Sequence, residues 1–270
     1  MNLKIGFIGV GSMATAIFES LVKSEDQLEK SIYLYDIDVV KTSKISQVYD
    51  VNIATSITDI ASKCEVIVLA VTPDALETVF EELSTVLTNQ MIFSVAVGIT
   101  LEKLETLAKK DVTIVRTMPN IGAMIGRSMT SYCVNKDLSK NESMVIDAFL
   151  NSFGKAVEIK EEKFDEFTAL CGSSPAFYIE IMDSMIAYGL DNGFAYEDVV
   201  KMVSETMITS AKLLQESSLK AKELINRIAT KGGTTEAGLK TLNKNHISKV
   251  IRDTLLATEN ESKKTKTSLD

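Results

Sequence analysis

The stretch Leu3 to Ala14, LKIGFIGVGSMA, decides the fold of the first part of the chain. Its apolar run is followed at once by the pattern G-x-G-x-x-A, and a segment with helical spacing begins at Ser12. Gly9 allows a tight turn, Gly11 lets a pyrophosphate approach the backbone, and Ala14 is small enough for the helix to pack on the strand. The stretch therefore predicts a strand, a turn and a helix that bind a dinucleotide. The contacts expected here are Ile8, Gly9, Val10, Gly11, Ser12, Met13 and Ala14.

An acidic residue, Asp36, ends the second strand-like run, IYLYD. A carboxylate at this point can accept both ribose hydroxyls of the adenosine half, and it repels a 2′-phosphate. The nearest basic residue downstream is Lys41. We therefore expect NADH rather than NADPH as the preferred cofactor. An alternative is that Asp36, or Asp38, only caps the helix that follows.

Strand-like and helix-like segments alternate through the first 160 residues. The strands are continuous apolar runs, which is typical of a parallel sheet covered by helices on both faces. We expect an α/β fold that begins with a doubly wound (Rossmann-type) domain over residues 1–160, in which pieces at 128–134 and 156–159 extend the sheet. The main strands are expected at 3–10, 32–36, 66–71, 91–97 and 112–118.

Loops at the ends of three of these strands are further candidates for cofactor binding. Open parallel sheets bind ligands at the carboxyl edge, where these loops lie. The side chain of Asn120 has the right chemistry to donate to the nicotinamide or the ribose. Each loop can equally be an ordinary strand-exit turn. The candidate residues are Ala70, Val71, Thr72, Pro73, Val95, Ala96, Gly98 and Asn120.

From residue 161 onward the pattern predicts helices only. The segment Pro175 to Asp191 is apolar nearly all round, which predicts burial on every side. A segment of this length has little material to bury it, so we expect an all-helical domain over 161–257 that packs against a second subunit; a self-contained helical core is the alternative. The polar tail, 258–270, is expected to be frayed.

Composition argues against several classes of protein. A net charge of −8 and a pI near 5.0 do not suit a broad basic surface for nucleic acid or an anionic membrane. The 3 cysteines lack metal-ligand spacing and suggest no disulfide framework. The sequence shows no secretory leader, and its apolar runs are far shorter than the roughly 18 residues that span a bilayer. We expect a cytoplasmic protein without a metal site.

The stretch Thr230 to Leu242, TKGGTTEAGLKTL, combines two glycines and two threonines before a helical pattern. Exposed backbone N–H groups and two hydroxyls make a plausible cradle for a small anion; a glycine-rich turn with a Thr N-cap is the alternative. Elsewhere, acid–base side chains are scarce, because the 1 histidine, His246, lies in a polar segment that predicts a surface position. A reaction in which cofactor and substrate supply most of the chemistry, such as hydride transfer, fits this sequence.

With these motifs in place, the chain resembles the pyrroline-5-carboxylate reductase family over essentially its whole length. The order and spacing of the motifs are specific together, although each one alone is weak. They are GFIGVGSMA at 6–14, AVTP at 70–73, SVAVGIT at 94–100, RTMPN at 116–120, FDEFTALCGSSPA at 164–176 and TKGGTTEAGL at 230–239.

The resemblance implies an enzyme that transfers hydride from NADH or NADPH to the C=N bond of 1-pyrroline-5-carboxylate, giving L-proline. It also implies a homodimer through the C-terminal helices, active sites assembled from both subunits, and larger assemblies of such dimers. By position, Thr235 would lie near the imine nitrogen as the catalytic residue. The implied substrate contacts are Glu161, Ser173, Thr230, Gly232, Gly233, Thr234 and Thr235.

Three features depart from the family pattern. Lys231 stands where the family usually has Pro, and Thr72 stands where it usually has Lys. The segment 193–197, GFAYE, lacks the usual Pro after its glycine, although it still predicts the start of a helix. Lys231 and Thr72 leave open a non-catalytic, regulatory paralogue that binds the dinucleotide. A second alternative is a reductase of the same architecture that acts on another cyclic imine or a β-hydroxyacid. Against a β-hydroxyacid dehydrogenase, the predicted first helix of the second domain lacks the G-x-x-x-K segment that carries the catalytic lysine of those enzymes.

Overall fold

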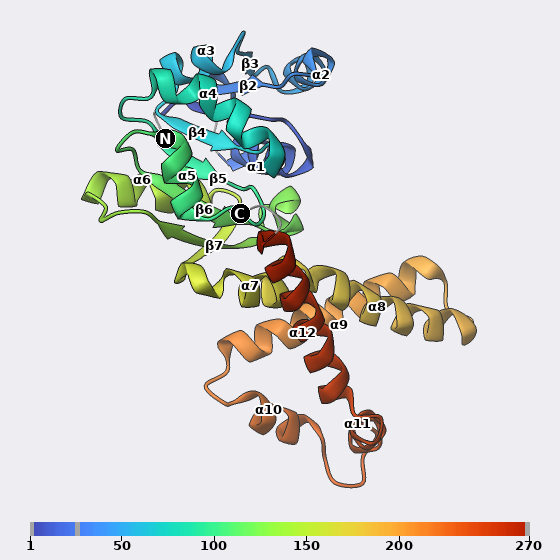
Figure 1. Cartoon of the computed structure of the whole chain (residues 1–270). Coiled ribbons are helices and arrows are strands. Elements are labelled where there is room, and N and C mark those ends of the chain that lie inside the picture. The colour runs from blue at the N-terminus through green and yellow to red at the C-terminus, as the bar shows by residue number, and fades with distance from the viewer. Residues whose placement is uncertain (1–2, 25–27, 268–270) are drawn as a thin grey trace. The chain divides into compact units, whose positions relative to one another are not determined.

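The computed structural model describes residues 3–24 and 28–267 of the chain. The chain divides into two compact units, which are described separately below. The first comprises Met1–Ser173 together with Thr258–Asp270, and the second comprises Ser174–Ala257. Figure 1 shows their helices and strands and labels most of them.

The first unit is built on an eight-stranded sheet in the order β3-β2-β1-β4-β5-β6-β7-β8. Strands β1 to β6 are parallel, β7 is antiparallel to β6, and β8 is parallel to β7. The predicted doubly wound sheet and its two-strand extension are confirmed, although each main strand is shorter than predicted. The strands are β1 Ile5–Ile8, β2 Ile32–Tyr35, β3 Asn52–Ile53, β4 Val66–Leu69, β5 Met91–Ser94, β6 Ile114–Met118, β7 Ser128–Val134 and β8 Gly154–Glu158.

Helices cover both faces of this sheet, which explains why its strands are apolar on both sides. One core lies under α3, α4 and α5 and includes Ile60, Phe80 and Leu104. The other lies under α1 and α6 and includes Phe18 and Phe149. The helices are α1 Ser12–Ser24, α2 Val39–Tyr49, α3 Ile57–Lys63, α4 Leu76–Val86, α5 Leu101–Ala108, α6 Lys140–Asn151 and α7 Phe164–Phe167, with short helical turns η1 Leu28–Ser31, η2 Pro73–Ala75, η3 Ile121–Ile125, η4 Glu161–Lys163 and η5 Thr168–Gly172.

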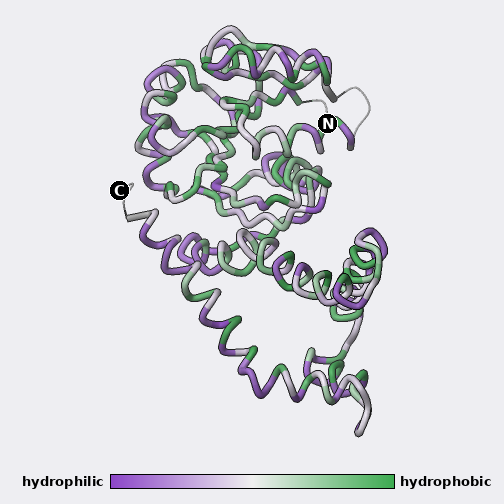
Figure 2. Tube along the Cα trace, turned by 90° about the vertical axis from the view of Figure 1, so that its right-hand side faces the viewer, coloured by the Kyte–Doolittle hydropathy of each residue, from purple (hydrophilic) through white to green (hydrophobic). Residues whose placement is uncertain are grey.

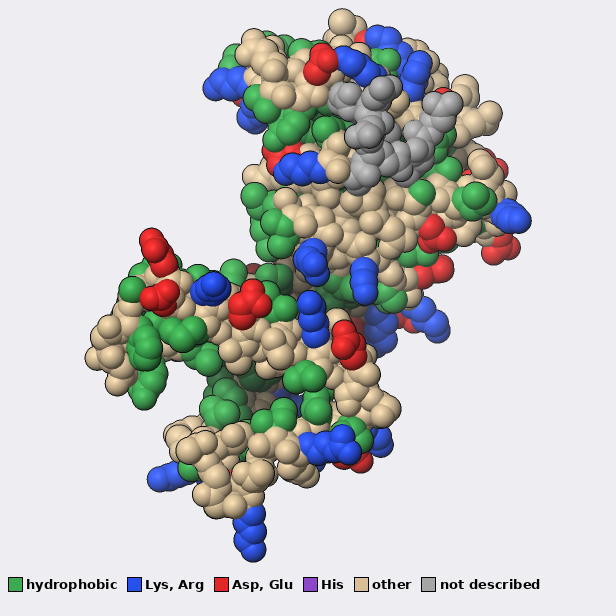
Figure 3. Space-filling view, turned by 180° about the vertical axis from the view of Figure 1, so that it is seen from behind, with side chains coloured by type: hydrophobic (Ala, Val, Ile, Leu, Met, Phe, Trp, Pro, Cys, Tyr) green, Lys and Arg blue, Asp and Glu red, His purple; other side chains and the backbone are tan. Residues whose placement is uncertain are grey.

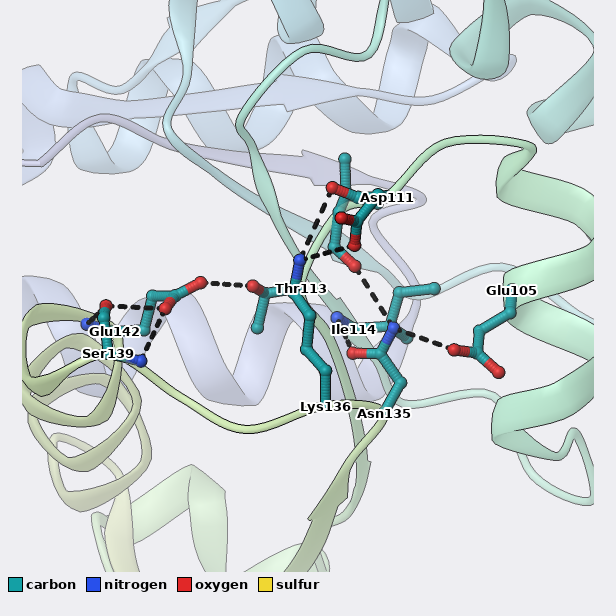
Figure 4. A network of polar contacts seen from close by, with 9 residues as sticks. Glu105, Asp111, Thr113, Ile114, Asn135, Lys136, Ser139 and Glu142 are labelled. Atoms are coloured by element: carbon teal, nitrogen blue, oxygen red, sulfur yellow. Dashed lines mark hydrogen bonds and ion pairs between the residues drawn. The ribbon is translucent and has the colours of Figure 1, made fainter.

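A polar network fastens the beginning of β6 to the segment between β7 and α6 (Figure 4). Asn135 Oδ1 accepts from Ile114 N at 2.8 Å, and its Nδ2 donates to Glu105 Oε1 at 3.1 Å. Glu142 accepts from the Thr113 hydroxyl and from Ser139, which caps α6. Hydrogen bonds from the Ser139 side chain first, and then from Thr113, lower the pKa of Glu142 to about 2. This network holds β6 in register, and the other end of β6 leads into the candidate site.

The second unit consists of helices α8 Ser174–Asp191, α9 Tyr196–Glu216, α10 Ala221–Ile228, α11 Thr234–Lys244 and the first part of α12 Ile247–Thr267. Helices α8 and α9 pack closely at Gly189, where an added Cβ would lie 2.7 Å from both methyl groups of Val199. Within the single chain, only Ser174 and Gly189 of α8 are buried. Hydrophobic residues recur along these helices (Figure 2). Because few of them are buried, hydrophobic side chains gather on the surface of this unit (Figure 3).

Two boundaries differ from prediction. The first unit extends to Ser173 rather than to residue 160, because hydrogen bonds of the Glu161 and Asn120 side chains anchor the segment after β8 to the sheet. The tail predicted to be frayed continues α12 to Thr267, and Ser262 Oγ donates to Asp165 Oδ1 at 2.6 Å. Among the residues described, none of the helices has both the length and the apolar character that crossing a membrane requires.

Candidate functional site

The glycine turn after β1 is held by contacts with both neighbouring strands. Gly9 has φ +90°, and its N–H donates to Tyr35 O at 2.8 Å. A Cβ on Gly9 would lie 2.6 Å from the carbonyl oxygen of Ala70, so the position requires glycine. By contrast, a Cβ on Gly11 would meet nothing within 4 Å. The turn is therefore closed toward the sheet at Gly9 and open toward a ligand at Gly11.

The N-terminus of α1 faces this open space with an unopposed positive end. The helix begins at Ser12, and its first turn contains no acidic residue. The first N–H groups of any α-helix lack an acceptor within the helix, and the helix dipole favours an anion there. Ala14 is fully buried against the sheet, as its small size predicts. The turn and α1 thus fit the pyrophosphate of a dinucleotide.

Asp36 lies against the glycine turn. Its Oδ2 accepts from Val10 N at 2.8 Å, and its Oδ1 accepts from Asp38 N at 2.9 Å. The N-cap of α2 is Asp38, whose Oδ1 accepts from Val40 N at 3.1 Å. Because a carboxylate oxygen can accept more than one hydrogen bond, Asp36 keeps acceptor capacity for ribose hydroxyls. Its role toward the ribose stays a prediction.

The loops after β4 and β5 lie at the same edge as the glycine turn, because β1, β4 and β5 are neighbouring parallel strands. Ala70 N donates to Ile8 O at 2.9 Å, which seats the first loop beside the turn. Thr72 is exposed, and its hydroxyl does not cap η2. In the second loop Gly98 has φ +82° and Val97 is 45% exposed. The structure thus brings the glycine turn together with two of the loops that the sequence singled out.

Asn120 is committed to contacts within the protein. Its Oδ1 accepts from Gly122 N at 3.0 Å and caps η3, while its Nδ2 donates to Cys171 O at 2.9 Å. The side chain thus ties the end of β6 to η5. One Nδ2 hydrogen is left for the predicted hydrogen bond to the cofactor. The contacts observed in the structure hold η5 against the end of β6.

Glu161 is also occupied, by two donors that share its Oε1. Arg116 Nη1 lies 2.6 Å from this oxygen, and Leu101 N at the start of α5 lies 2.7 Å from it. The Arg116 guanidinium also lies over the ring of Phe164, 4.3 Å from the ring centroid. Glu161 therefore joins β6, α5 and the segment that follows β8. Its predicted contact with the substrate stays a prediction.

No role was predicted for Arg116. Its side chain is 7% exposed, and a narrow recess beside it is lined by Val97, Gly98, Met118 and Thr168. A basic residue inside an otherwise apolar strand was the available signal, since a buried cation needs a partner. Ser173, also predicted to contact substrate, is half-buried at the end of η5, where its N–H donates to Thr168 O at 2.9 Å in a π-helical turn. Such turns are frequent at functional sites.

The loop before α11 belongs to the second unit and already has partners for two of its amides. Gly233 N donates to Thr230 O at 3.0 Å, and Gly232 N donates to Glu236 Oε2 at 2.8 Å. Gly233, not a threonine, occupies the N-cap, so the alternative of a Thr cap is wrong. Thr234 and Thr235 form the exposed first residues of α11. The first N–H groups of an α-helix lack acceptors within the helix, so those of Thr234 and Thr235 are available to an anion. The predicted contacts of Gly232 and Gly233 with the substrate stay predictions.

Comparison with known proteins matches two parts of the chain to known families. Residues 161–265 match the family described as pyrroline-5-carboxylate reductase dimerisation, and residues 4–98 match that described as NADP oxidoreductase coenzyme F420-dependent. The chain is 30% identical over 264 residues to a pyrroline-5-carboxylate reductase of Aquifex aeolicus, covering 98% of both chains. It is 28% identical to pyrroline-5-carboxylate reductase 2 of Bacillus subtilis, covering 92% of this chain and 90% of that one.

Solved structures give the same result. The chain superposes on a Plasmodium falciparum pyrroline carboxylate reductase with NADP bound, with a TM-score of 0.88, 27% identity and 98% coverage of both chains. It also superposes on a 1-pyrroline-5-carboxylate reductase of Streptococcus pyogenes, with a TM-score of 0.85, 30% identity and coverage of 97% of this chain and 98% of that one.

The contact between Arg116 and Glu161 generates a stability prediction. We expect Glu161→Gln to lower the free energy of unfolding by about 3 kcal/mol, because it leaves the buried guanidinium without a counter-charge. The double variant R116M/E161Q should recover part of that loss, since no buried charge is left unpaired. Urea unfolding of the two single variants and the double variant measures the coupling. Strictly additive losses would contradict it.

Proposed function

The chain belongs to the pyrroline-5-carboxylate reductase family, and we propose that it transfers hydride from NAD(P)H to the C=N bond of 1-pyrroline-5-carboxylate, giving L-proline. This proposal rests on the similarity to such reductases over 98% of the chain, which includes both the glycine turn after β1 and the loop before α11. No part of the chain needs to supply a strong acid or base, because an iminium substrate carries its own proton.

The first unit supplies the cofactor contacts in this proposal. A bound NAD(P)H supplies the hydride. The residues present fit such a cofactor, because Gly11 leaves open space and the first turn of α1 has no acidic side chain. The amides at the start of α1 would hold the pyrophosphate, and Asp36 the adenosine ribose. The loops after β4 and β5 would border the remainder of the cofactor.

The second unit supplies the substrate contacts. The amides of Thr234 and Thr235 at the start of α11 would hold the carboxylate, and the Thr235 hydroxyl would orient the imine nitrogen. Lys231 is exposed in the same loop and adds positive charge near a bound carboxylate. Gly232, with φ +77°, gives the loop its turn. Ser173 stays a predicted contact in the segment that Asn120 fastens.

Turnover tests this function together with Thr235. Purified protein should oxidise NADH or NADPH when 1-pyrroline-5-carboxylate is added. We expect Thr235→Ala to lower kcat at least tenfold, about 1.4 kcal/mol in the barrier, and to leave cofactor affinity nearly unchanged. Thr241→Ala on the same helix, whose hydroxyl donates to Ala237 O, is the control and should keep the full rate. Cofactor binding without turnover would instead establish the non-catalytic alternative, and a normal rate for Thr235→Ala would remove Thr235 from the mechanism.

We further propose a preference for NADH, which the surroundings of Asp36 support. Ile37 follows it with 92% of its surface exposed, and the next residue is Asp38. Lys41 Nζ lies 3.9 Å from an oxygen of Asp38 and so already faces a carboxylate. A 2′-phosphate at this point would meet negative charge with little compensation.

A single added cation tests this preference. We expect Ile37→Arg to raise kcat/KM for NADPH about tenfold and to change that for NADH little, because a guanidinium pairs well with a phosphate. Val48→Arg, at a position of 72% exposure further along α2, adds the same net charge as the control. Steady-state kinetics with both cofactors gives the ratio. A wild-type preference for NADPH, or an equal gain from Val48→Arg, would contradict the assignment.

We also propose a homodimer formed through the helices of the second unit, and larger assemblies of such dimers. Large apolar side chains of this unit stay exposed in the single chain, among them Tyr188 at 72% and Ile179 at 59%. Such surface usually marks an interface.

We also propose a cytoplasmic location. The three free cysteines, two of them buried, suit a reducing compartment.

Light scattering tests the dimer. The native mass should be at least twice the chain mass of 29.6 kDa. We expect Met185→Glu on α8 to weaken association, because it places a charge in an apolar interface. Met144→Glu on α6, which has 61% exposure in the first unit, is the matched control. A native mass equal to that of one chain would refute the proposal.

A further inference from the structure

Glu236 holds an amide of the substrate loop. It is the acidic residue in the first turn of α11, and its Oε2 accepts from Gly232 N at 2.8 Å. Lys240 Nζ lies 3.3 Å from the same oxygen, and the Glu236 side chain is 33% exposed. A carboxylate of the chain itself therefore already lies at the loop that is proposed to receive the carboxylate of the substrate.

The contact differs from the usual helix cap. In α6 and α10 a glutamate of the first turn accepts from the backbone N–H of the N-cap residue, at 2.8 Å for Glu142 and Ser139 and at 2.9 Å for Glu223 and Lys220. In α11 the N-cap amide of Gly233 is held by Thr230 O instead. Glu236 reaches past it to the next amide outward.

We propose that Glu236 is an affinity-determining residue, which competes with the carboxylate of the substrate for the loop. This inference rests on the proposed function. The negative charge lies at the N-terminus of α11, where a bound anion would gain most from the helix dipole. A second carboxylate must either displace Glu236 from Gly232 or bind beside it against repulsion. Substrate and product both carry this group, so Glu236 weakens the binding of both.

The competing role and a capping role predict opposite signs. If Glu236 only stiffens the loop, its loss loosens the loop and raises KM for the substrate. If it competes, its loss removes a rival charge and lowers KM. The sign of the change therefore separates them. The same comparison covers a third role, in which Glu236 attracts the cationic iminium, because that role also predicts a higher KM.

The test is Glu236→Gln, which keeps the side-chain size and removes the charge. We expect KM for 1-pyrroline-5-carboxylate and the dissociation constant of proline to fall about fivefold, which corresponds to about 1 kcal/mol, with kcat within about twofold. The fall should shrink at high salt, where exposed charges are screened. The ring 1-pyrroline, which lacks the carboxylate, should show no such gain.

Glu223→Gln is the matched control, because it removes the same kind of contact from α10. It should leave all these constants unchanged. An unchanged or higher KM for Glu236→Gln, or an equal gain with 1-pyrroline, would overturn the competing role while leaving the reductase function in place. If the unmodified protein fails to reduce the substrate at all, the proposed function fails, and the role of Glu236 fails with it.

Discussion

The rest of the structure depends on the close approach of two backbones at Gly9. The residue takes a positive φ, donates to Tyr35 O on β2, and lies where a Cβ would meet the carbonyl of Ala70 after β4. One backbone position therefore sets the spacing of three parallel strands at their carboxyl ends. A side chain there would separate β1 from β4 and shift α1, whose N-terminus is the proposed anion site. The cofactor side of the site is in this sense a consequence of one missing side chain.

A second constraint is the charge buried at Arg116. A cation inside a strand is tolerated only with a partner, and Glu161 provides it while also capping the start of α5 through Leu101 N. Asn120 makes a similar connection, because its side chain at the end of β6 donates to Cys171 O. Together they anchor the segment that leads out of the sheet. The need of the buried Arg116 for a charged partner thus helps to fix the position of the segment in which Ser173 lies.

The sequence predicted the strands and the glycine turn well, because continuous apolar runs and G-x-G-x-x-A depend on local rules. It failed where tertiary contacts decide. The first unit continues past residue 160 because Glu161 and Asn120 bind this segment to the sheet, and the pairing of residues so far apart in the chain has no local signature. The tail was expected to fray from its polarity, yet Ser262 finds Asp165. Resemblance implied that Glu161 was close to substrate, but only geometry shows that its oxygen is already shared by two donors.

The two helix N-termini that are proposed to bind anions, one in each unit, differ in how much of their positive end is free. That of α1 has no acidic residue in its first turn, whereas that of α11 carries Glu236. In the proposed function, a dinucleotide pyrophosphate would meet an open set of amides, and a small carboxylate would meet a set that is partly filled. In this proposal, the binding of negative charge is favoured at α1, on the cofactor side, and weakened at α11, on the substrate side. The product of the proposed reaction is an anion closely similar to the substrate. Weaker binding of the carboxylate at α11 therefore acts on substrate and product alike, and it raises KM as well as the rate of product release.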